Sequence, residues 1–389
     1  MSAILGFSRK FPVKIVRAKG IHLFDSNGKQ YCDFTSGIAT VNFGHCNEYI
    51  SKKVSEQIHT LWHCSNLFSS EIQERTATKL INATSFGDKV FFCSSGLEAI
   101  EAAVKFIKRY FYECGDTAKT EILTLKNGFH GRSATGISAG GTEEARRGFA
   151  PLLKGFTQVE ANNVDELKAK VSHNTAAVIL ELIQSEGGIY EITNDYLENL
   201  QILREKFGFL LCFDEIQTGF GRIGQLFHYE NLGVEPDLLT CAKGMGNGFP
   251  VGGCIVSKGI ASVLPLGTHG GTYSGNALAM AAVGATLDLL DKEFLSNVTK
   301  MSEYLSSSLR ELAALLPEQI IDIRGRGLLM GVEIAQKVDT WDLLLKCLES
   351  GLALNRTSKK QVLRILPPLI VEKSNIDFAV EVLYKHLKS

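Results

Sequence analysis

The sequence predicts an α/β protein with a mostly parallel β-sheet that is covered by helices on both faces. Apolar strand-like runs alternate with helix-like runs through the middle of the chain. The strand-like runs are apolar almost throughout, as in strands buried on both faces. With 389 residues, 45% of them apolar, the chain is too long for one typical domain, so we expect two.

The elements of this sheet follow in order along the chain. The predicted strands are short apolar runs at residues 89–93, 121–125, 176–182, 209–213, 238–241 and 251–256. The predicted helices have apolar residues at helical spacing and span residues 97–110, 164–171, 195–207 and 276–290. Because such sheets bind ligands beyond the carboxyl ends of their strands, residues at those ends are the first candidates for a functional site.

The two ends of the chain predict a second, smaller α/β domain. Residues 21–24 and 31–34 flank a turn at 25–28 and form a predicted hairpin, and a second turn is expected at Gly325 and Gly327. We expect three regions: residues 1–50 are an N-terminal arm and part of the small domain, 51–275 the large domain, and 276–389 a linker helix and the C-terminal small domain.

Composition excludes several classes of function. The 41 basic and 42 acidic residues nearly balance, which gives no overall field for nucleic acid or an anionic membrane. No run of 18 apolar residues predicts a membrane span. The nine cysteines are odd in number and form no C-x-x-C motif, so we expect reduced thiols in a cytoplasmic protein.

Two chemically distinctive residues end neighbouring predicted strands. Lys243 follows the strand at 238–241, and Asp214 follows the strand at 209–213. One crossover fits between them, so both should lie at the same edge of a parallel sheet. A pyridoxal phosphate (PLP) enzyme needs this pair, because the lysine forms a Schiff base with the aldehyde and the acid keeps the pyridine nitrogen protonated.

Ser95, Gly96 and Leu97 join a predicted strand to a predicted helix. A serine hydroxyl and the N–H groups of a helix N-terminus can hold a phosphate group. The same residues also suit ordinary helix capping. Beside Lys243 and Asp214, they become the expected site of the cofactor's phosphate.

Further candidates each carry a functional and an ordinary interpretation. Phe129 ends a strand and can stack on a planar ring, and Arg132 can hold a carboxylate, but both also suit a plain loop. Glu186 is either a surface residue or the partner of an arginine. Arg364 lies among apolar residues, so it is either buried and paired or exposed on an edge strand that Pro367 limits.

Other motifs support different chemistries less well. Residues 136–140 match the G-x-S-x-G elbow of hydrolases, but no strand precedes Ser138 directly, so a serine hydrolase is a remote alternative. His59 and His63 have helical spacing without a third ligand, and we expect no metal. Neither G-x-G-x-x-G nor a P-loop motif is present, which argues against a dinucleotide enzyme or an ATPase.

Together these motifs resemble the class III aminotransferases, which share fold type I of the PLP enzymes. Within that family the chain is most similar to the acetylornithine aminotransferases. The resemblance covers nearly the whole chain, and the matching runs are Gly37-Ile38-Ala39, Gly44-His45, Ser65-Asn66-Leu67-Phe68, Ser95-Gly96-Leu97-Glu98-Ala99, Phe129-His130-Gly131-Arg132, Asp214-Glu215-Ile216-Gln217-Thr218-Gly219, Gly221-Arg222, Ala242-Lys243-Gly244 and His269-Gly270-Gly271-Thr272.

The resemblance implies PLP as the cofactor and assigns a role to each matching residue. Lys243 is the implied Schiff-base lysine and proton shuttle, and Asp214 the acid at the pyridine nitrogen. The implied cofactor-binding residues are Ser95, Gly96, Leu97, Phe129, Asp214, Gln217, Lys243 and Thr272. The implied substrate-binding residues are Arg132, Glu186, Gly271 and Arg364, with Glu186 pairing with Arg364 in one half-reaction. Thr272 is implied to reach the phosphate of a neighbouring subunit, which gives a homodimer with shared active sites.

The implied reaction is ping-pong transfer of an amino group between small amino and oxo acids. N-acetylornithine gives its amino group to 2-oxoglutarate, which yields N-acetylglutamate semialdehyde and glutamate, as in arginine biosynthesis. Ile38 replaces a tyrosine that grips free ornithine in ornithine aminotransferases, which favours an acylated donor. Succinyldiaminopimelate, ornithine and 4-aminobutyrate stay open as donors, as do an aminomutase or a decarboxylase. Departures from the family pattern leave substrate detail open; they are Asn47, Leu97, Leu182, Ser185 and Gly271.

Overall fold

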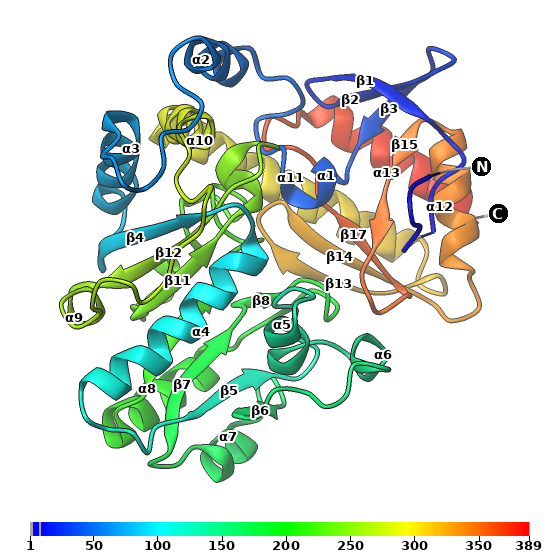
Figure 1. Cartoon of the computed structure of the whole chain (residues 1–389). Helices are drawn as coiled ribbons and strands as arrows, with labels where there is room; N and C mark the ends of the chain where they lie inside the picture. The colour runs from blue at the N-terminus through cyan, green and yellow to red at the C-terminus, as the bar shows by residue number, and fades with distance from the viewer. Residues whose placement is uncertain (1–2, 8, 389) are drawn as a thin grey trace.

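A seven-stranded sheet forms the centre of the larger part of the molecule (Figure 1). The computed structural model describes residues 3–7 and 9–388. The strand order is β4-β12-β11-β10-β7-β5-β6, and only β12 runs antiparallel to its neighbours. The strands are β4 (Gly87–Cys93), β5 (Glu121–Leu125), β6 (Phe156–Val159), β7 (Thr175–Leu180), β10 (Leu210–Asp214), β11 (Leu238–Cys241) and β12 (Gly252–Ser257). The predicted, mostly parallel sheet is therefore confirmed.

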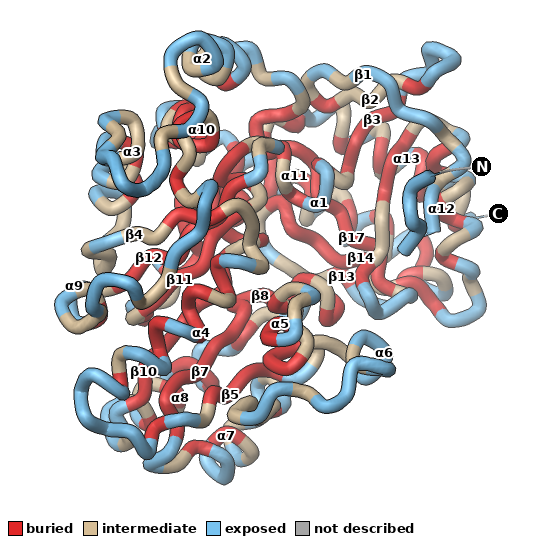
Figure 2. Tube along the Cα trace, viewed as in Figure 1, coloured by how far each residue is buried: buried red, intermediate tan, exposed pale blue. Residues whose placement is uncertain are grey.

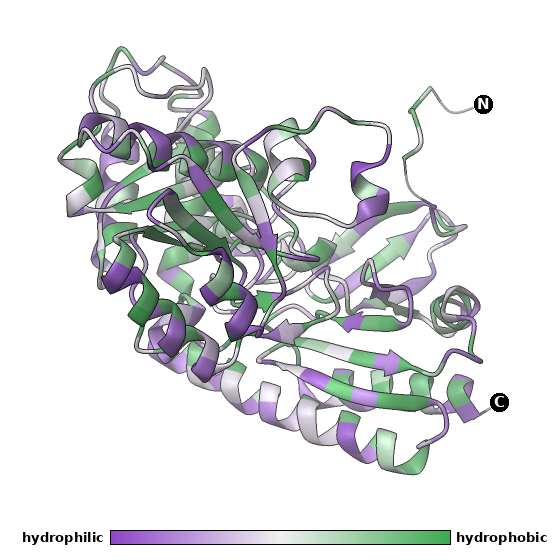
Figure 3. Cartoon of the chain, turned by 90° about the horizontal axis from the view of Figure 1, so that it is seen from below, coloured by the Kyte–Doolittle hydropathy of each residue, from purple (hydrophilic) through white to green (hydrophobic). Residues whose placement is uncertain are grey.

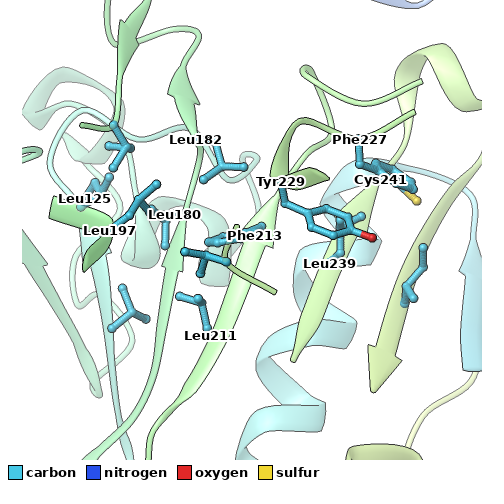
Figure 4. Close-up of a cluster of buried hydrophobic side chains, with 14 of the residues drawn as sticks. Leu125, Leu180, Leu182, Leu197, Leu211, Phe213, Phe227, Tyr229, Leu239 and Cys241 are labelled. Carbon is cyan, nitrogen blue, oxygen red and sulfur yellow. The ribbon is translucent and has the colours of Figure 1, made fainter. Parts of the chain in front are cut away.

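The central strands are buried on both faces, as their apolar sequences predicted. Every residue of β7, β10 and β11 is buried, and Figure 2 shows this buried interior beneath exposed helices and loops. Alternate residues of β10 face opposite ways. Leu211 and Phe213 belong to the cluster shown in Figure 4, whereas Leu210 and Cys212 pack in a second cluster with α4.

Helices cover both faces of this sheet. They are α2 (Glu48–Ile58), α3 (Glu71–Asn82), α4 (Gly96–Glu113), α5 (Ala134–Ala139), α6 (Glu143–Arg146), α7 (Val164–Lys170), α8 (Asn194–Phe207), α9 (Lys258–Ala261) and α10 (Ala277–Leu289). Side chains of α8 and α10 join one apolar cluster, and those of α4 join the other. Figure 3 shows helices that carry both hydrophobic and hydrophilic residues, as expected where one side of a helix is buried and the other is exposed.

The ends of the chain come together in a second region. Its sheets have the orders β1-β2-β3-β15 and β13-β14-β17-β16. The strands are β1 (Ile15–Lys19), β2 (His22–Asp25), β3 (Gln30–Asp33), β13 (Ile320–Arg326), β14 (Leu329–Ile334), β15 (Leu352–Ala353), β16 (Asn355–Arg356) and β17 (Val362–Ile365), and the helices are α11 (Lys292–Leu315), α12 (Thr340–Glu349) and α13 (Lys373–Lys388). In Figure 1 the blue N-terminal strands lie beside the orange and red C-terminal elements.

Each region has its own apolar core. Ile21, Cys32 and Phe34 from the N-terminal strands pack with side chains of α11, α12 and α13. The predicted hairpin is confirmed, because β2 and β3 pair antiparallel. Side chains of α10 lie in the core of the larger region and those of α11 in the core of the smaller one. The boundaries at residues 50 and 275 stay a prediction.

The predicted turn at Gly325 and Gly327 is confirmed at Gly327 but not at Gly325. Strand β13 continues through Gly325, and the turn lies at Gly327 and Leu328. A side chain at Gly325 would place its Cβ 2.3 Å from the Leu329 carbonyl oxygen. Glycine is needed at position 325 because the two strands approach each other closely there. A glycine of this kind cannot be distinguished in the sequence from a turn glycine.

Smaller features complete the fold. The short elements are α1 (Ser36–Ala39), β8 (Ile183–Gln184), β9 (Tyr190–Glu191) and the 3₁₀ helices η1 (His228–Asn231) and η2 (Lys243–Gly246). All nine cysteines are free thiols, and the four in strand-like runs are buried as predicted: Cys93, Cys212, Cys241 and Cys254. Within residues 3–7 and 9–388, no helix is long and apolar enough to span a membrane.

Candidate active site

A cavity of about 640 Å³ lies at the carboxyl ends of the central strands. Asp214 ends β10, and Lys243 lies two residues after the end of β11. These strands pair in parallel with Asp214 opposite Thr240, so both ends meet at one edge. The predicted residues that line the cavity are Ser95, Gly96, Leu97, Phe129, Arg132, Glu186, Asp214, Gln217 and Lys243.

The amine of Lys243 is hydrogen-bonded, and its pKa is lowered. Its Nζ donates a hydrogen bond to Gln217 Oε1 at 3.0 Å. Burial lowers the pKa of Lys243 most, and the positive charge of Arg364 lowers it further. The negative charges of Glu186 and Asp214 oppose this only in part, so the pKa falls from 10.5 to about 8. A lysine with this pKa can act as a nucleophile and as a base near neutral pH.

This pKa predicts the pH at which Lys243 becomes reactive. Only the neutral amine attacks acetic anhydride, so labelling of Lys243 in the cofactor-free protein should rise with pH and reach half its maximum near pH 8. Mass spectrometry of the peptide that contains Lys243 measures the labelling. The unfolded protein is the control, because Lys243 should there titrate near 10.5. A folded-state midpoint near 10.5 would contradict the expectation.

Asp214 is buried, and both oxygens of its carboxyl group have hydrogen-bond partners. Its Oδ2 lies 2.7 Å from His130 Nδ1, and its Oδ1 accepts bonds from Thr240 Oγ1 and the Ile216 N–H, both at 3.2 Å. Burial lowers the pKa of His130, but the bond to Asp214 and that acid's charge outweigh burial and raise it. His130 and Thr240 therefore fix the position of the Asp214 carboxyl group at the end of its strand.

The loop before α4 can hold a phosphate group. Ser95 Oγ caps the helix by accepting a bond from the Glu98 N–H at 3.3 Å, so the capping interpretation is correct. The N–H groups of Gly96 and Leu97 lie in the first turn, where no carbonyl of the helix can accept them. A Cβ at Gly252 would lie 2.4 Å from the Ser95 carbonyl oxygen, so β12 approaches this loop closely.

The residues around the cavity fit PLP. Buried Gln217 Nε2 has no hydrogen-bond partner among the described residues and can donate to a ligand oxygen. Free helix N–H groups, an amine, a carboxylate and the ring of Phe129 line the same space. These groups match the phosphate, aldehyde, pyridine nitrogen and ring face of the cofactor.

Arg364 and Glu186 form an ion pair on one side of the cavity. Arg364 lies on β17 between β14 and β16, its side chain is 2% exposed, and its Nη1 lies 2.5 Å from Glu186 Oε1. The edge-strand interpretation is therefore wrong. Burial raises the pKa of Glu186, but the charge of Arg364 and its hydrogen bond outweigh burial and lower it. Ser358 Oγ donates to Glu186 Oε2 at 3.2 Å.

Glu181 connects two parts of the cavity wall. Its Oε2 accepts the Phe129 N–H at 2.9 Å, and its Oε1 accepts the N–H and Oγ of Ser185 at 3.2 Å and 2.9 Å. Burial is the largest cause of its raised pKa. The predicted strand at 176–182 ends at Leu180. The side chain of Glu181 instead accepts hydrogen bonds from the loops that contain Phe129 and Ser185.

A left-handed turn forms another part of the wall. Ser36, Gly37, Ile38 and Ala39 have φ angles from 46° to 66°. This conformation costs about 1–2 kcal/mol for each residue other than glycine. Ser36 Oγ donates to the Leu366 carbonyl at 2.5 Å, and Ile38 faces the cavity with 43% of its surface exposed. The fold thus holds Ile38 at the cavity against its backbone preference.

Comparison with known proteins agrees with this site. The family described as "Aminotransferase class-III" matches residues 7–387. The chain belongs to this family. This aminotransferase uses PLP, as class-III aminotransferases do, and the solved neighbours confirm its fold class.

Individual relatives and structures are similar along almost their full length. The acetylornithine aminotransferase of Oceanobacillus iheyensis is 41% identical over 98% of this chain and 95% of its own, and that of Archaeoglobus fulgidus is 39% identical over 95% and 94%. The ornithine aminotransferase of Toxoplasma gondii aligns with a TM-score of 0.94 and 28% identity. This alignment covers 99% of this chain and 92% of the solved chain. The N-acetylornithine aminotransferase of Stenotrophomonas maltophilia aligns with a TM-score of 0.84 and 29% identity. This alignment covers 98% of this chain and 96% of the solved chain.

Three predicted site residues of the aminotransferase are not among those that line its own cavity. One is Arg364, although it is paired with Glu186, which does line the cavity. Gly271 and Thr272 are exposed and are not among the lining residues. The Gly271 carbonyl accepts a bond from Asn66 Nδ2 at 3.0 Å, which ties this loop to another exposed segment. A role for them in the active site of a neighbouring subunit stays a prediction.

The hydrolase alternative does not match the aminotransferase structure. Ser138 lies inside α5 rather than at a strand–helix elbow. Its Oγ donates to the Ala134 carbonyl at 2.7 Å and accepts the Leu153 N–H at 2.9 Å. The hydroxyl therefore stabilises backbone, and the motif match is a coincidence of glycine spacing.

Sequence reasoning missed three side chains at this site. His130 stood within a matching motif, and its position next to Phe129 was the available signal. Glu181 was an acid at the end of a buried apolar run, which is a signal for a bonded carboxylate. Ser358 lies in a polar segment without any distinguishing pattern.

Proposed function

We propose that this aminotransferase moves the amino group of N-acetylornithine to 2-oxoglutarate, which yields N-acetylglutamate semialdehyde and glutamate in arginine biosynthesis. The observation that carries the proposal is the Glu186–Arg364 pair beside Lys243. Such a pair suits a site that accepts one substrate with a carboxylate at the reacting carbon and another without it. The similarity to acetylornithine aminotransferases, at 38–41% identity, supports the choice of donor.

The cofactor would be held by the residues that line the cavity. We assign the phosphate to Ser95, Gly96 and Leu97, the ring face to Phe129, the phenolic oxygen to Gln217, the pyridine nitrogen to Asp214 and the aldehyde to Lys243. When bound, PLP supplies an aldehyde that links to amines and a ring that accepts electrons from the substrate carbon.

Lys243 and Asp214 divide the proton chemistry in this proposal. With a pKa near 8, the amine of Lys243 can take a proton from the substrate carbon and return it. Gln217 Oε1 orients that amine. Asp214 is held in place by His130 and Thr240, and its carboxylate would keep a proton on the group that faces it.

Two arginines would distinguish the substrates. The δ-carbon of N-acetylornithine, where the amino group leaves, carries no carboxylate, so Glu186 stays on Arg364 while exposed Arg132 binds the distant carboxylate. The reacting carbon of glutamate does carry a carboxylate. Glu186 then leaves Arg364 free to bind it, and Arg132 takes the side-chain carboxylate. The same site can therefore serve both halves of a ping-pong reaction.

Assembly and location belong to the same proposal. We propose a homodimer in which Thr272 reaches the phosphate of the neighbouring site, supported by the exposure of this residue and its absence from the lining of its own cavity. The nine free thiols support a cytoplasmic location.

A screen of half-reactions tests the proposed donor. Purified PLP-loaded protein is mixed separately with N-acetylornithine, succinyldiaminopimelate, ornithine and 4-aminobutyrate, and loss of the cofactor's visible absorption is followed. N-acetylornithine should react with the highest rate divided by apparent dissociation constant, and added 2-oxoglutarate should restore the absorption and release glutamate. Faster conversion by free ornithine would favour the activity named for several structural neighbours instead.

A further inference from the structure

Glu186 sits at the tip of a short hairpin whose base is fixed. Strands β8 and β9 pair antiparallel, and the Ile189 N–H donates to the Gln184 carbonyl at 2.9 Å. On the other side, Ser185 is tied to Glu181 by its N–H and by its hydroxyl. The backbone on both sides of Glu186 is therefore anchored, and its carboxylate moves mainly through its own side-chain torsions.

Each carboxylate oxygen of Glu186 has a separate partner. Oε1 pairs with Arg364 Nη1 at 2.5 Å, and Oε2 accepts the hydroxyl of Ser358 at 3.2 Å. Ser358 lies between β16 and β17, lines the same cavity and has an exposed side chain. Its bond to Glu186 exists only while Glu186 points toward Arg364, so it stabilises that position alone.

We propose that Ser358 is a positioning residue that holds Glu186 on Arg364 and thereby weakens the binding of substrates that need a free Arg364. The proposal rests on the proposed function, in which Glu186 must leave Arg364 before a dicarboxylate binds. A group that stabilises one of two states shifts the population toward it by the free energy of its differential contact. Ser358 therefore sets part of the balance between the two half-reactions.

Removing the Ser358 hydroxyl should change the binding free energy of a dicarboxylate by about that of one hydrogen bond. Ser358→Ala destabilises the Glu186–Arg364 position and leaves the exposed loop backbone unchanged. A dicarboxylate should then bind about fivefold more tightly, which corresponds to one ordinary hydrogen bond. A monocarboxylate that uses Arg132 alone should bind as before.

Calorimetric titration of the PLP-loaded protein tests this without turnover. The probes are glutarate, which has two carboxylates, and pentanoate, which has one; neither carries an amino or oxo group. In S358A the dissociation constant for glutarate should fall about fivefold while that for pentanoate stays constant. S358T keeps the hydroxyl and should restore wild-type binding. S262A is the matched control, because Ser262 is an exposed serine whose hydroxyl bonds to the Gly259 carbonyl in its own turn.

Three outcomes would overturn the role of Ser358. They are an unchanged ratio of the two dissociation constants in S358A, an equal change for both probes, and an S358T protein that behaves like S358A. Glutarate that binds neither the wild-type protein nor S358A would also contradict it. The proposed function fails separately, if the wild-type protein transfers no amino group from N-acetylornithine in the half-reaction screen.

Discussion

Replacing Lys243 with alanine should abolish amino-group transfer and remove the visible absorption of the lysine-linked cofactor. In the proposed mechanism Lys243 supplies both the amine that links to the aldehyde and the base that moves the substrate proton, and no other lysine among the described residues lines the cavity. Loss of a nucleophile and a proton shuttle together should lower turnover at least about a thousandfold. Steady-state assay of glutamate release and an absorption spectrum measure the two effects.

A matched lysine shows whether the loss is specific. Lys300 lies on α11, is exposed and is far along the chain from the cavity residues, so Lys300→Ala should keep activity and absorption. Thermal unfolding of both variants separates loss of chemistry from loss of fold. Full activity in the Lys243→Ala protein would refute the assignment of the active site.

Replacing Asp214 with asparagine should lower turnover about a hundredfold or more. Asparagine keeps the shape of the side chain, but it removes the carboxylate that we propose holds a proton on the facing cofactor nitrogen. The raised pKa of His130 depends in part on the same charge, so the imidazole should also lose its proton more easily. Single-turnover rates with N-acetylornithine measure the first effect, and the NMR titration of His130 measures the second.

Asp237 provides the control for this substitution. It lies at the amino ends of the same two strands, where it accepts bonds from Arg204 Nη2 at 2.6 Å and from the Leu211 N–H at 2.8 Å. Asp237→Asn removes a comparable carboxylate at the opposite edge of the sheet. It should reduce stability without changing the single-turnover rate, and equal rate losses in both variants would mean that Asp214 acts only through the fold.

The parts of the site that the sequence revealed are those with local signals. Asp214 and Lys243 each end an apolar run, and the parallel order of β10 and β11 then decides that both lie at one edge. Ser95 precedes a helix, where both capping and ligand binding use the same N–H groups, so both functions could be predicted.

The parts that could not be predicted depend on contacts between distant segments. Glu186 and Arg364 are 178 residues apart, and only the place of β17 inside its sheet buries the arginine. Glu181 falls within the predicted strand at 176–182. The apolar run there does not show that its carboxylate will accept hydrogen bonds from the distant Phe129 loop. Gly325 gave the signal of a turn, although close strand contact was the cause.

The left-handed turn at residues 36–39 has a consequence for any attempt to redesign the donor preference. Position 38 faces the cavity, so it is an obvious target for mutagenesis, yet its backbone has a φ of 66°. Asparagine, aspartate and glycine tolerate that conformation, whereas valine and threonine oppose it. In a library at this position, main-chain geometry will therefore limit which residues are tolerated before substrate fit can be selected.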